Sequence, residues 1–338
     1  MSVKEKNLYG LRNMKVGNPS HKRIISILED GKVHHISEFT KFMSYDGLRG
    51  RVSELNKWGY VIRRVDEVGH AKYNGEYLKC ITVPIRENIN EIISVDLTPV
   101  NNKVEIIPLG DIHYGNPCFT EKSEEKLDGY IDYILKTDGA YTILMGDLIE
   151  SANERSTFKL QVTPQEQYEW ILDKFSKLAK AGKILCVISG NHENWIFNDK
   201  GFDIVKMLSL NLKIPYLGDS GYLGIKVGKQ FYTFYLIHPR TAVTKKSSKI
   251  RMLEDLGSIH DVDVIITGHV HSIITEEQIR RKPNFVTKSI DNIKQLLIAS
   301  GAFLEYGDYA EQSRYKPENM GAPKVKLYSH KHDMHMGK

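Results

Sequence analysis

Cysteine is scarce in this sequence, and long apolar runs are missing. Only three cysteines occur among the 338 residues, and no two of them form a CxxC pair. An odd, unpaired set argues against a disulfide framework and against a thiolate zinc site. The longest apolar runs, around Tyr141–Met145 and Ile184–Ile188, are far shorter than the roughly 18–20 residues that cross a membrane. We therefore expect no membrane partner.

A secretory signal is missing as well. The first residues, Met1–Lys6, contain no apolar stretch. Apolar residues make up 41% of the chain and charged residues 26%, which is typical of a folded globular protein. The length suits two domains of ordinary size. The sequence therefore predicts a cytoplasmic protein of two parts. It does not indicate an oligomeric state.

The net charge of +5 is unevenly distributed. Residues 1–95 contain 16 basic and 11 acidic residues, and the remaining 31 basic and 31 acidic residues balance. A basic module beside a neutral one is the arrangement expected if the first part contacts a polyanion. A solvated protein surface is the alternative explanation for so small a surplus.

The first part of the chain has the pattern of a small α+β domain over residues 19–85, after an N-terminal tail at residues 1–18. Apolar residues recur at helical spacing in three short segments, which Ser20, Ser37 and Asp46 can cap. Two β-branched segments follow, separated by an Asn-Gly turn signal. The predicted elements are helices at Ser20–Gly31, Glu38–Met43 and Asp46–Trp58, and strands at Tyr60–Val65 and Tyr77–Val83, joined by a turn at residues 73–76.

This order of elements is similar to the winged helix-turn-helix domains of DNA-binding proteins. The resemblance implies that the third helix enters the major groove. Arginine can contact guanine edges and asparagine can contact adenine edges, so the outward residues suit DNA. The nucleic-acid-binding residues expected here are Arg49, Arg51, Asn56 and Lys57. A protein-docking or purely structural role is the alternative. Residues 86–103 are expected to form a linker and the first strand of the next domain.

In the second part of the chain, five strand-like segments each end at a polar residue. Helical segments at residues 124–136, 166–181 and 249–256 lie between several of them. Such alternation predicts an α/β sheet, in which ligands bind beyond the carboxyl ends of the strands. The five segments are Val104–Leu109, Tyr141–Met145, Ile184–Ser189, Phe231–Ile237 and Val262–Thr267.

The polar residues at these strand ends have the side chains of a metal site. Imidazole, carboxylate and amide groups suit manganese, iron, zinc or nickel. Seven ligands are more than one tetrahedral site needs, and they suit two adjacent divalent ions. The alternative is a purely structural role, in which each residue caps the end of its strand. The candidate ligands are Asp111, His113, Asp147, Asn191, His238, His269 and His271.

The motifs GDIH at residues 110–113, GD at 146–147, GNHE at 190–193 and GHVH at 268–271, with His238, resemble the signature of calcineurin-like metallophosphoesterases. A looser similarity at residues 299–317 is to phage members of that family, which implies a bacterial or phage-infected host cytoplasm. The resemblance implies a metallophosphoesterase α/β/β/α sandwich over residues 104–329, with a C-terminal tail at residues 330–338.

The resemblance also implies a role for each residue. One metal is expected on Asp111, His113 and His271, the other on Asn191, His238 and His269, and Asp147 bridges them. Manganese is the first choice of metal. His192 matches the family's catalytic histidine, and Glu193 is expected to orient or tune it.

The expected function is a two-metal phosphodiesterase or nuclease that acts on DNA through a metal-bridging hydroxide, with His192 as general acid. A basic segment after His238, from Arg240 to Arg251, either follows a nucleic-acid backbone or is a solvated helix face. One alternative is a phosphomonoesterase, for nucleotides or proteins, whose winged helix docks or regulates. Another is a DNA-binding regulator with a structural metal domain.

Overall fold

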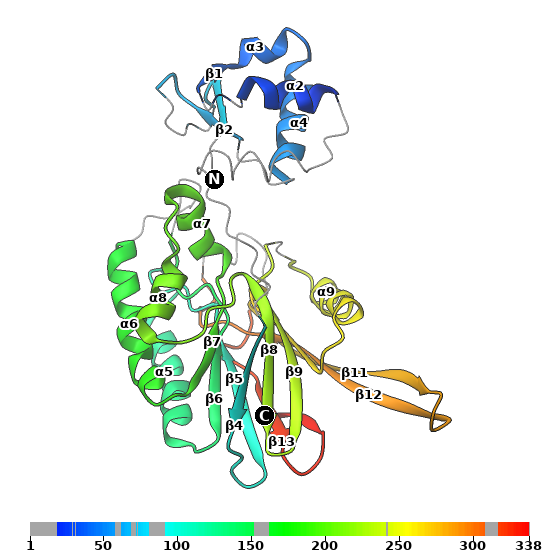
Figure 1. Cartoon of the computed structure of the whole chain (residues 1–338). Helices are drawn as coiled ribbons and strands as arrows, with labels where there is room; N and C mark the ends of the chain where they lie inside the picture. Colours follow the sequence, from blue (N-terminus) through cyan, green and yellow to red (C-terminus); the bar gives the residue numbers. More distant parts are fainter. Residues whose placement is uncertain are drawn as a thin grey trace. The chain divides into compact units, whose positions relative to one another are not determined.

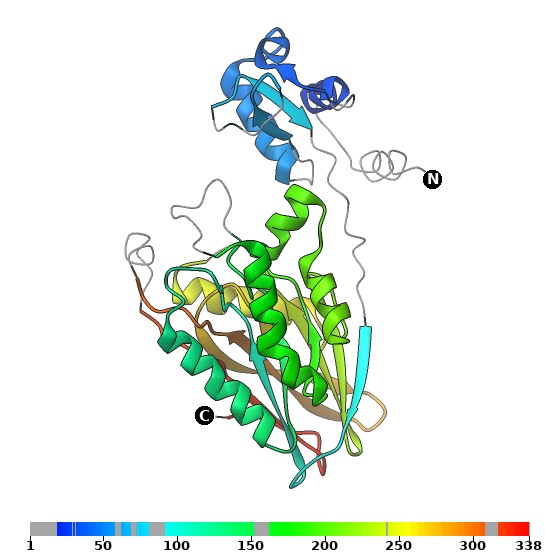
Figure 2. The ribbon, with the colours of Figure 1, turned by 90° about the vertical axis from the view of Figure 1, so that its left-hand side faces the viewer.

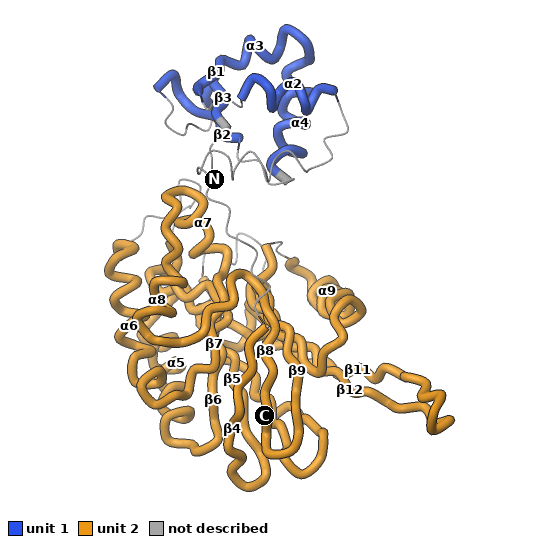
Figure 3. The backbone as a smooth tube through the Cα atoms, in the orientation of Figure 1, with its two compact units in different colours: residues 1–87 blue, residues 88–338 orange. Residues whose placement is uncertain are grey.

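The structure is a computed structural model, and it describes residues 19–28, 30, 32–57, 62–68, 72, 74–80, 92–151, 162–240, 243–307 and 317–337. The chain divides into two compact units, Met1–Glu87 and Asn88–Lys338 (Figure 3). This division lies within a few residues of the predicted domain boundary. The predicted N-terminal tail and the first part of the predicted linker lie outside the described residues.

The described residues of unit 1 form three helices and a small antiparallel sheet with the strand order β1-β3-β2. Its core joins all three helices to the sheet through apolar side chains that include Ile24, Phe39, Leu55 and Leu78. The helices therefore come before the β2–β3 pair, as the sequence predicts. The elements are α2 (Pro19–Leu28), β1 (His34–His35), α3 (Ile36–Thr40), α4 (Tyr45–Lys57), β2 (Ile62–Val65) and β3 (Tyr77–Cys80).

Two local details differ from the prediction for unit 1. Helix α3 begins at Ile36 because His35, not Ser37, is its cap: the ring of His35 accepts a hydrogen bond from the Ser37 N–H at 3.2 Å. Strand β3 pairs with β2 so that Tyr77 lies opposite Val65. The connection therefore spans residues 66–76, which is longer than the predicted turn at residues 73–76, although β2 ends and β3 begins where the sequence predicts.

Unit 2 contains two sheets that pack face to face. The first has the order β14-β13-β5-β6-β7, in which β5, β6 and β7 are parallel. The second has the order β11-β12-β10-β9-β8-β4. The first sheet consists of β5 (Lys103–Leu109), β6 (Ala140–Leu144), β7 (Ile184–Val187), β13 (Lys324–Tyr328) and β14 (Met334–Gly337); the second consists of β4 (Ile92–Leu97), β8 (Ser220–Val227), β9 (Gln230–Ile237), β10 (Val264–Thr267), β11 (Ile273–Asn284) and β12 (Ser289–Ser300).

Helices cover the outer face of each sheet (Figures 1 and 2). The first sheet packs against α5 (Glu121–Lys136), α6 (Pro164–Lys180) and α8 (Ile204–Leu212), and the second packs against α9 (Lys246–Ile259). A separate core fills the space between the sheets, with Ile106, Ile143, Leu185, Phe234 and Ile266 among its buried side chains. Unit 2 is therefore a mixed α/β sandwich, as predicted.

The five predicted strands of unit 2 and the three helices between them are all present within a few residues of the expected bounds. The predicted early strand is also present as β4, at the edge of the second sheet. The predicted C-terminal tail is wrong, because Met334–Gly337 form β14 and pair with β13. No helix in the described ranges combines the length and the apolarity that crossing a membrane requires.

Candidate metal centre

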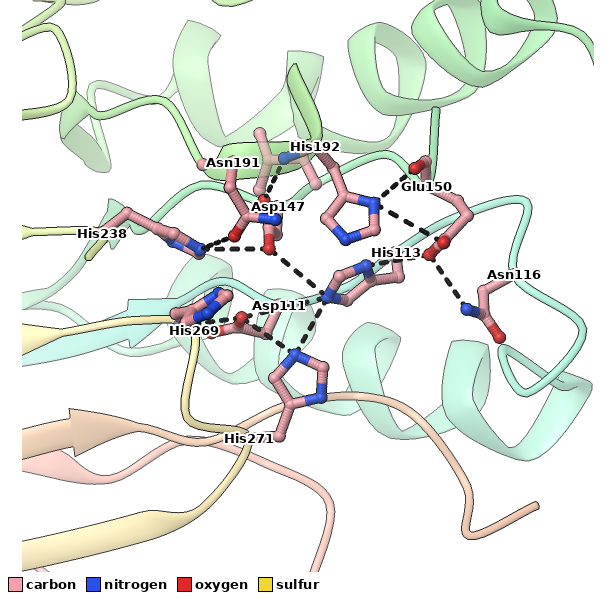
Figure 4. A network of polar contacts seen from close by, with 12 residues as sticks. Asp111, His113, Asn116, Asp147, Glu150, Asn191, His192, His238, His269 and His271 are labelled. Atoms are coloured by element: carbon pink, nitrogen blue, oxygen red, sulfur yellow. Dashed lines mark hydrogen bonds and ion pairs between the residues drawn. The ribbon is translucent and has the colours of Figure 1, made fainter. Parts of the chain in front are cut away.

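The seven predicted ligands come together at one place in unit 2 (Figure 4). Strands β5, β6 and β7 are parallel, and so are β9 and β10, so the residues that follow each group of strands emerge at one edge of its sheet. Because the two sheets face each other, both edges contribute to one cluster. Asn191 and His192 come after β7, at the start of α7 (Asn191–Lys200).

The backbone at these strand ends turns through an unusual conformation. Five of the candidate ligands have φ between 47° and 72°, the left-handed region that few residues other than glycine adopt. Such residues cost on the order of 1–3 kcal/mol each and are concentrated at functional sites. Gly190 allows the backbone after β7 to approach the Asp147 side chain closely, since a Cβ atom at this position would lie 2.1 Å from Asp147 Oδ1. The five ligands are Asp111, His113, Asp147, His269 and His271.

One group of ligand atoms comes from Asp111, His113 and His271. The Nε2 atoms of the two histidines lie 3.1 Å apart, and Asp111 Oδ1 lies 3.3 Å from His271 Nε2. Asp111 is held in place by the backbone N–H of His269, which donates to both carboxylate oxygens at 3.0 Å. These three side chains match the set predicted for the first metal.

A second group surrounds Asp147. His238 Nε2 lies 3.0 Å from Asp147 Oδ2 and 3.2 Å from Asn191 Oδ1. The candidate ligand atoms of Asp147, His238 and His269 all lie within 4.8 Å of one another. His113 Nε2 lies 3.7 Å from Asp147 Oδ2, so Asp147 stands between the two groups. This is the position expected of a bridging carboxylate.

The second group contains buried polar atoms that lack a hydrogen-bond partner in the described structure: the two ring nitrogens of His269. Burying such atoms without a partner costs about 1–3 kcal/mol each. A divalent cation would bind one of these nitrogens, and imidazole nitrogen suits such an ion. The residues present therefore fit the metal centre that the sequence predicts.

Hydrogen bonds outside the cluster aim the ligand nitrogens inward. His113 Nδ1 donates to Glu150 Oε2 at 2.9 Å, and His238 Nδ1 donates to the Met145 carbonyl at 2.7 Å. Each bond leaves Nε2 free to face the centre, an arrangement typical of metal-binding histidines. Glu150 also accepts from Asn116 Nδ2 at 2.9 Å. The sequence analysis missed Glu150, although it lies three residues after Asp147.

His192 lies beside this centre. Its backbone N–H donates to Asp147 Oδ1 at 2.9 Å, and its Nδ1 donates to the Glu150 carbonyl. The His192 ring packs against Trp195, with ring centroids 4.1 Å apart. A ring nitrogen of His192 also lies within 4.8 Å of ligand atoms of His113 and Asp147. His192 is thus placed to contact whatever binds between the two ligand groups.

Glu193 makes backbone contacts that the sequence did not predict. Its side chain is 1% exposed and accepts hydrogen bonds from the backbone N–H groups of Asp147, Leu148 and Gly190 at 3.0, 2.6 and 2.8 Å. A further bond comes from the Ile149 N–H at 3.2 Å. Glu193 therefore fastens the loop after β6 to the loop after β7. The expected orienting role is therefore corrected to this one, whereas the expected tuning is present, because the pKa of His192 is raised against the effect of burial and the charge of Glu193 contributes to this rise.

The charges in the cluster shift one another strongly. Burial opposes the charged form of His238, but Asp147 and Asp111 outweigh burial and raise the pKa of His238 to about 10. Burial and the neighbouring His238 lower the pKa of His269 to about 4. Burial also disfavours the Asp147 carboxylate, yet His238 and His192 hold its pKa well below the usual range. His269 is therefore neutral at pH 7, the form in which imidazole binds a metal.

The four residues predicted to bind DNA lie in unit 1 and are used differently. Arg49 is exposed, whereas Arg51 Nη1 donates to Glu54 Oε2 at 2.7 Å. The Asn56 side chain binds the backbone of Ile62, accepting from its N–H at 2.7 Å and donating to its carbonyl at 3.1 Å. Asn56 thus fixes the start of β2, which corrects its prediction as a base-contacting residue. The Lys57 side chain lies outside the described part.

The basic segment after β9 is also divided. Arg240 forms an ion pair with Asp219 at 3.0 Å, and Lys249 is buried, where its amine donates to Ser272 Oγ. Lys245, Lys246 and Arg251 are exposed. Only part of the segment is therefore available to a ligand.

Residues 105–272 match the calcineurin-like phosphoesterase family. Unit 2 therefore contains a calcineurin-like metallophosphoesterase domain. The matched range begins in β5 and ends just after His271, so it includes all seven candidate ligands. The family assignment makes this domain a metal-dependent hydrolase of phosphoesters. No curated protein is significantly similar to the chain in sequence.

Solved structures similar to the metallophosphoesterase domain come from several bacteria. The E. coli phosphoesterase Yfce has 14% identity and a TM-score of 0.36, over 66% of this chain and 88% of that one. A nuclease named MPE from Pseudomonas putida has 15% identity and a TM-score of 0.32, over 65% and 83%. The calcineurin-like phosphoesterase YfkN from Bacillus subtilis has 12% identity and a TM-score of 0.34, over 67% and 84%. At these values the similarities carry no argument about substrate.

Proposed function

We propose that the protein is a two-metal phosphodiesterase that acts on DNA. The observation that supports two metals is the position of Asp147 between the two groups of ligand atoms, with Oδ2 3.0 Å from His238 Nε2 on one side and 3.7 Å from His113 Nε2 on the other. In this proposal Asp111, His113 and His271 hold one ion, and Asn191, His238 and His269 hold the other. When bound, two such cations polarise phosphoryl oxygens and lower the pKa of water.

His192 is the proposed general acid. Its Nδ1 is engaged by the Glu150 carbonyl, so Nε2 is the nitrogen that can give a proton to the departing oxygen. The ring is positioned by three contacts: the Glu150 carbonyl, the Asp147 carboxylate on its backbone N–H, and Trp195 on its face. Manganese is the metal we propose among those that a mixed set of imidazole, carboxylate and amide ligands suits, which also include iron, zinc and nickel.

DNA is the proposed substrate because unit 1 has the element order of a winged helix-turn-helix domain. Among the described residues, helices α2, α3 and α4 come before an antiparallel pair of strands, and Arg49 is exposed on α4, the helix that would meet the major groove. The basic surplus of the first 95 residues supports the same assignment. Unit 1 would then bring DNA to the hydrolase.

The test is an assay of the full chain with Mn²⁺ on three substrates: single-stranded DNA, duplex DNA and a generic aryl phosphomonoester. We expect DNA hydrolysis that is lost in His192→Ala and in Asp147→Asn. His330→Ala, an exposed histidine outside the cluster, is the matched control and should behave as wild type. Hydrolysis of the monoester alone would mean a phosphomonoesterase. Full activity in Asp147→Asn would contradict the two-metal assignment.

A further inference from the structure

The β11–β12 hairpin extends far beyond the sheet to which it belongs. Its two strands pair antiparallel over twelve residue pairs, from Ile273 opposite Ser300 to Asn284 opposite Ser289. Figure 1 shows the hairpin projecting from the body of unit 2. Residues 295–300 of β12 are buried, because that end of the strand lies beside β10, whereas residues 289–292 are exposed. The distal half, residues 279–292, is called the arm below.

The arm exposes apolar side chains at its tip. Phe285 is 87% exposed and Val286 92%, and Ile279 and Ile290 are each 53% exposed. A two-stranded ribbon with no further layer over it gains little from such residues. Apolar side chains that stay in water on a projecting element are typical of a binding surface.

The arm is also basic. It contains four basic residues and one acidic residue, Asp291. Arg280 is engaged by Asp261 at 2.9 Å. Arg281, Lys282 and Lys288 are exposed and form no ion pair with any residue that the structure describes. Three cations therefore surround the apolar tip with their charges unneutralised.

Strand pairing sorts the arm into two faces. Side chains alternate along each strand, so Ile279, Arg281 and Pro283 point to the same side. Their cross-strand partners are Lys294, Asn292 and Ile290. That face combines basic, amide and apolar groups and has no carboxylate over the length of the arm. Asp291 lies on the other face, opposite Lys282.

We propose that the arm binds duplex DNA by placing its tip in a groove. A two-stranded ribbon fits the major groove, and apolar tips of architectural proteins insert at base steps in the minor groove. Arg281, Lys282 and Lys288 would meet backbone phosphates on either side. This inference rests on DNA as the proposed substrate. A second copy of the chain is disfavoured as the occupant, because two like-charged tips repel each other.

The test measures DNA binding by the full chain in EDTA, where hydrolysis cannot interfere. The probe is a fluorescein-labelled duplex of about 30 base pairs, followed by anisotropy over a range of salt concentrations. One variant combines Arg281→Gln, Lys282→Gln and Lys288→Gln. The matched control combines Lys180→Gln, Lys206→Gln and Lys229→Gln, three exposed lysines elsewhere in unit 2. A second variant replaces residues 280–293 by Asn-Gly, a pair that forms a tight hairpin turn.

We expect both arm variants to weaken duplex binding about tenfold and the arm charge variant to lower the salt slope by up to about 2.7, while the control stays near wild type. All variants should hydrolyse a small aryl phosphodiester at the wild-type rate with Mn²⁺, which shows that the metal centre is intact. Wild-type affinity in both arm variants would overturn the inference, even if the wild-type protein hydrolyses DNA.

Failure of the proposed function has a different signature. If the wild-type protein binds DNA through the arm but hydrolyses no DNA, the arm stands and the substrate assignment falls. Vesicles of phosphatidylcholine with phosphatidylserine provide the competing occupant. Arm-dependent sedimentation with these vesicles, together with unchanged DNA binding, would overturn the inference in favour of a membrane.

Discussion

At the scale of single residues, the ligands depend on side chains that do not touch the metal position. Glu150 accepts from His113 Nδ1, and Gly190 leaves room for Asp147. Glu193 holds the backbone on which Asp147 lies. Such outer contacts fix the ring orientation and the protonation state of each ligand. The chemistry of the centre is therefore distributed over more residues than the seven ligands.

Glu150→Gln tests this dependence. An amide can still contact His113 Nδ1 but carries no charge, so it favours the ligating form of the ring less strongly. We expect the affinity for Mn²⁺ to fall about 10–100-fold, with a similar loss of phosphodiester hydrolysis at limiting metal. Metal titration by calorimetry measures the affinity. Glu125→Gln, at an exposed position on α5, is the control and should leave the affinity unchanged.

Glu193→Ala tests the stability of the two loops. Four backbone N–H groups would lose their acceptor, and most of them are buried. We expect a loss of about 2–4 kcal/mol in the free energy of unfolding of unit 2, seen as a fall of several degrees in its melting temperature. Glu193→Gln, which keeps one acceptor oxygen, should recover part of the loss. An unchanged melting temperature in Glu193→Ala would contradict the fastening role.

At the scale of elements, strand β5 joins the parallel and antiparallel parts of the first sheet. It pairs with β6 on one side and with β13 on the other. Glu105 on this strand is buried and accepts from Tyr133 Oη at 2.6 Å and from Lys103 Nζ at 2.9 Å. Lys324 on β13 lies 3.3 Å from the same carboxylate. The charge network thus ties helix α5 and strand β13 to β5.

The stability of this network depends on pH. Burial opposes ionisation, but Tyr133, Lys103 and Lys324 outweigh it and lower the pKa of Glu105 from 4.5 to about 2. A lowered carboxyl pKa stabilises the folded state above about pH 4.5, and this stabilisation is lost as the pH falls toward 2. We expect the free energy of unfolding of the wild type to exceed that of Glu105→Gln by about 2 kcal/mol at pH 6. This difference should vanish near pH 2. Urea unfolding of the two proteins at several pH values measures it.

The strands that are followed by metal ligands could be predicted from the sequence more completely than the other elements. Strands such as Ile184–Val187 are short, apolar and followed by Gly and a polar residue, so their ends and their function coincide. The β11–β12 hairpin was missed because much of it is exposed and polar, so it lacks a clear alternating pattern. Strand β14 was missed because residues 330–338 were expected to form a tail. Pairing with β13, a tertiary effect, decides its conformation.

The metal centre could also be predicted in large part from the sequence. All seven ligands and His192 converge as expected, because identity and strand position together determine them. The prediction failed where the side chain makes a local backbone contact. Asn56 binds the backbone of Ile62, and Glu193 binds four backbone N–H groups. The residue types along the sequence do not indicate either contact. Glu150 carried a weak signal, an acidic residue shortly after a ligand.

At the scale of the whole molecule, the two units should separate in function. Unit 2 contains every candidate metal ligand and its own cores, so removal of residues 1–87 should leave two metals per chain and the turnover of a small aryl phosphodiester unchanged. DNA hydrolysis should fall, since the proposed reading module is gone. Elemental analysis and parallel assays on both substrates check this. Equal DNA hydrolysis with and without unit 1 would contradict the delivery role.

The pairing of β13 with β5 has a consequence for synthesis of the chain. The first sheet contains neighbours that lie more than 200 positions apart, since Val325 is opposite Ile106. While the ribosome is still adding the middle of the protein, β5 has one side with no partner. That side can accept only a late segment of its own polypeptide or a strand from another one. Slow translation of the codons just before β13 should therefore favour aggregation of nascent chains over productive folding.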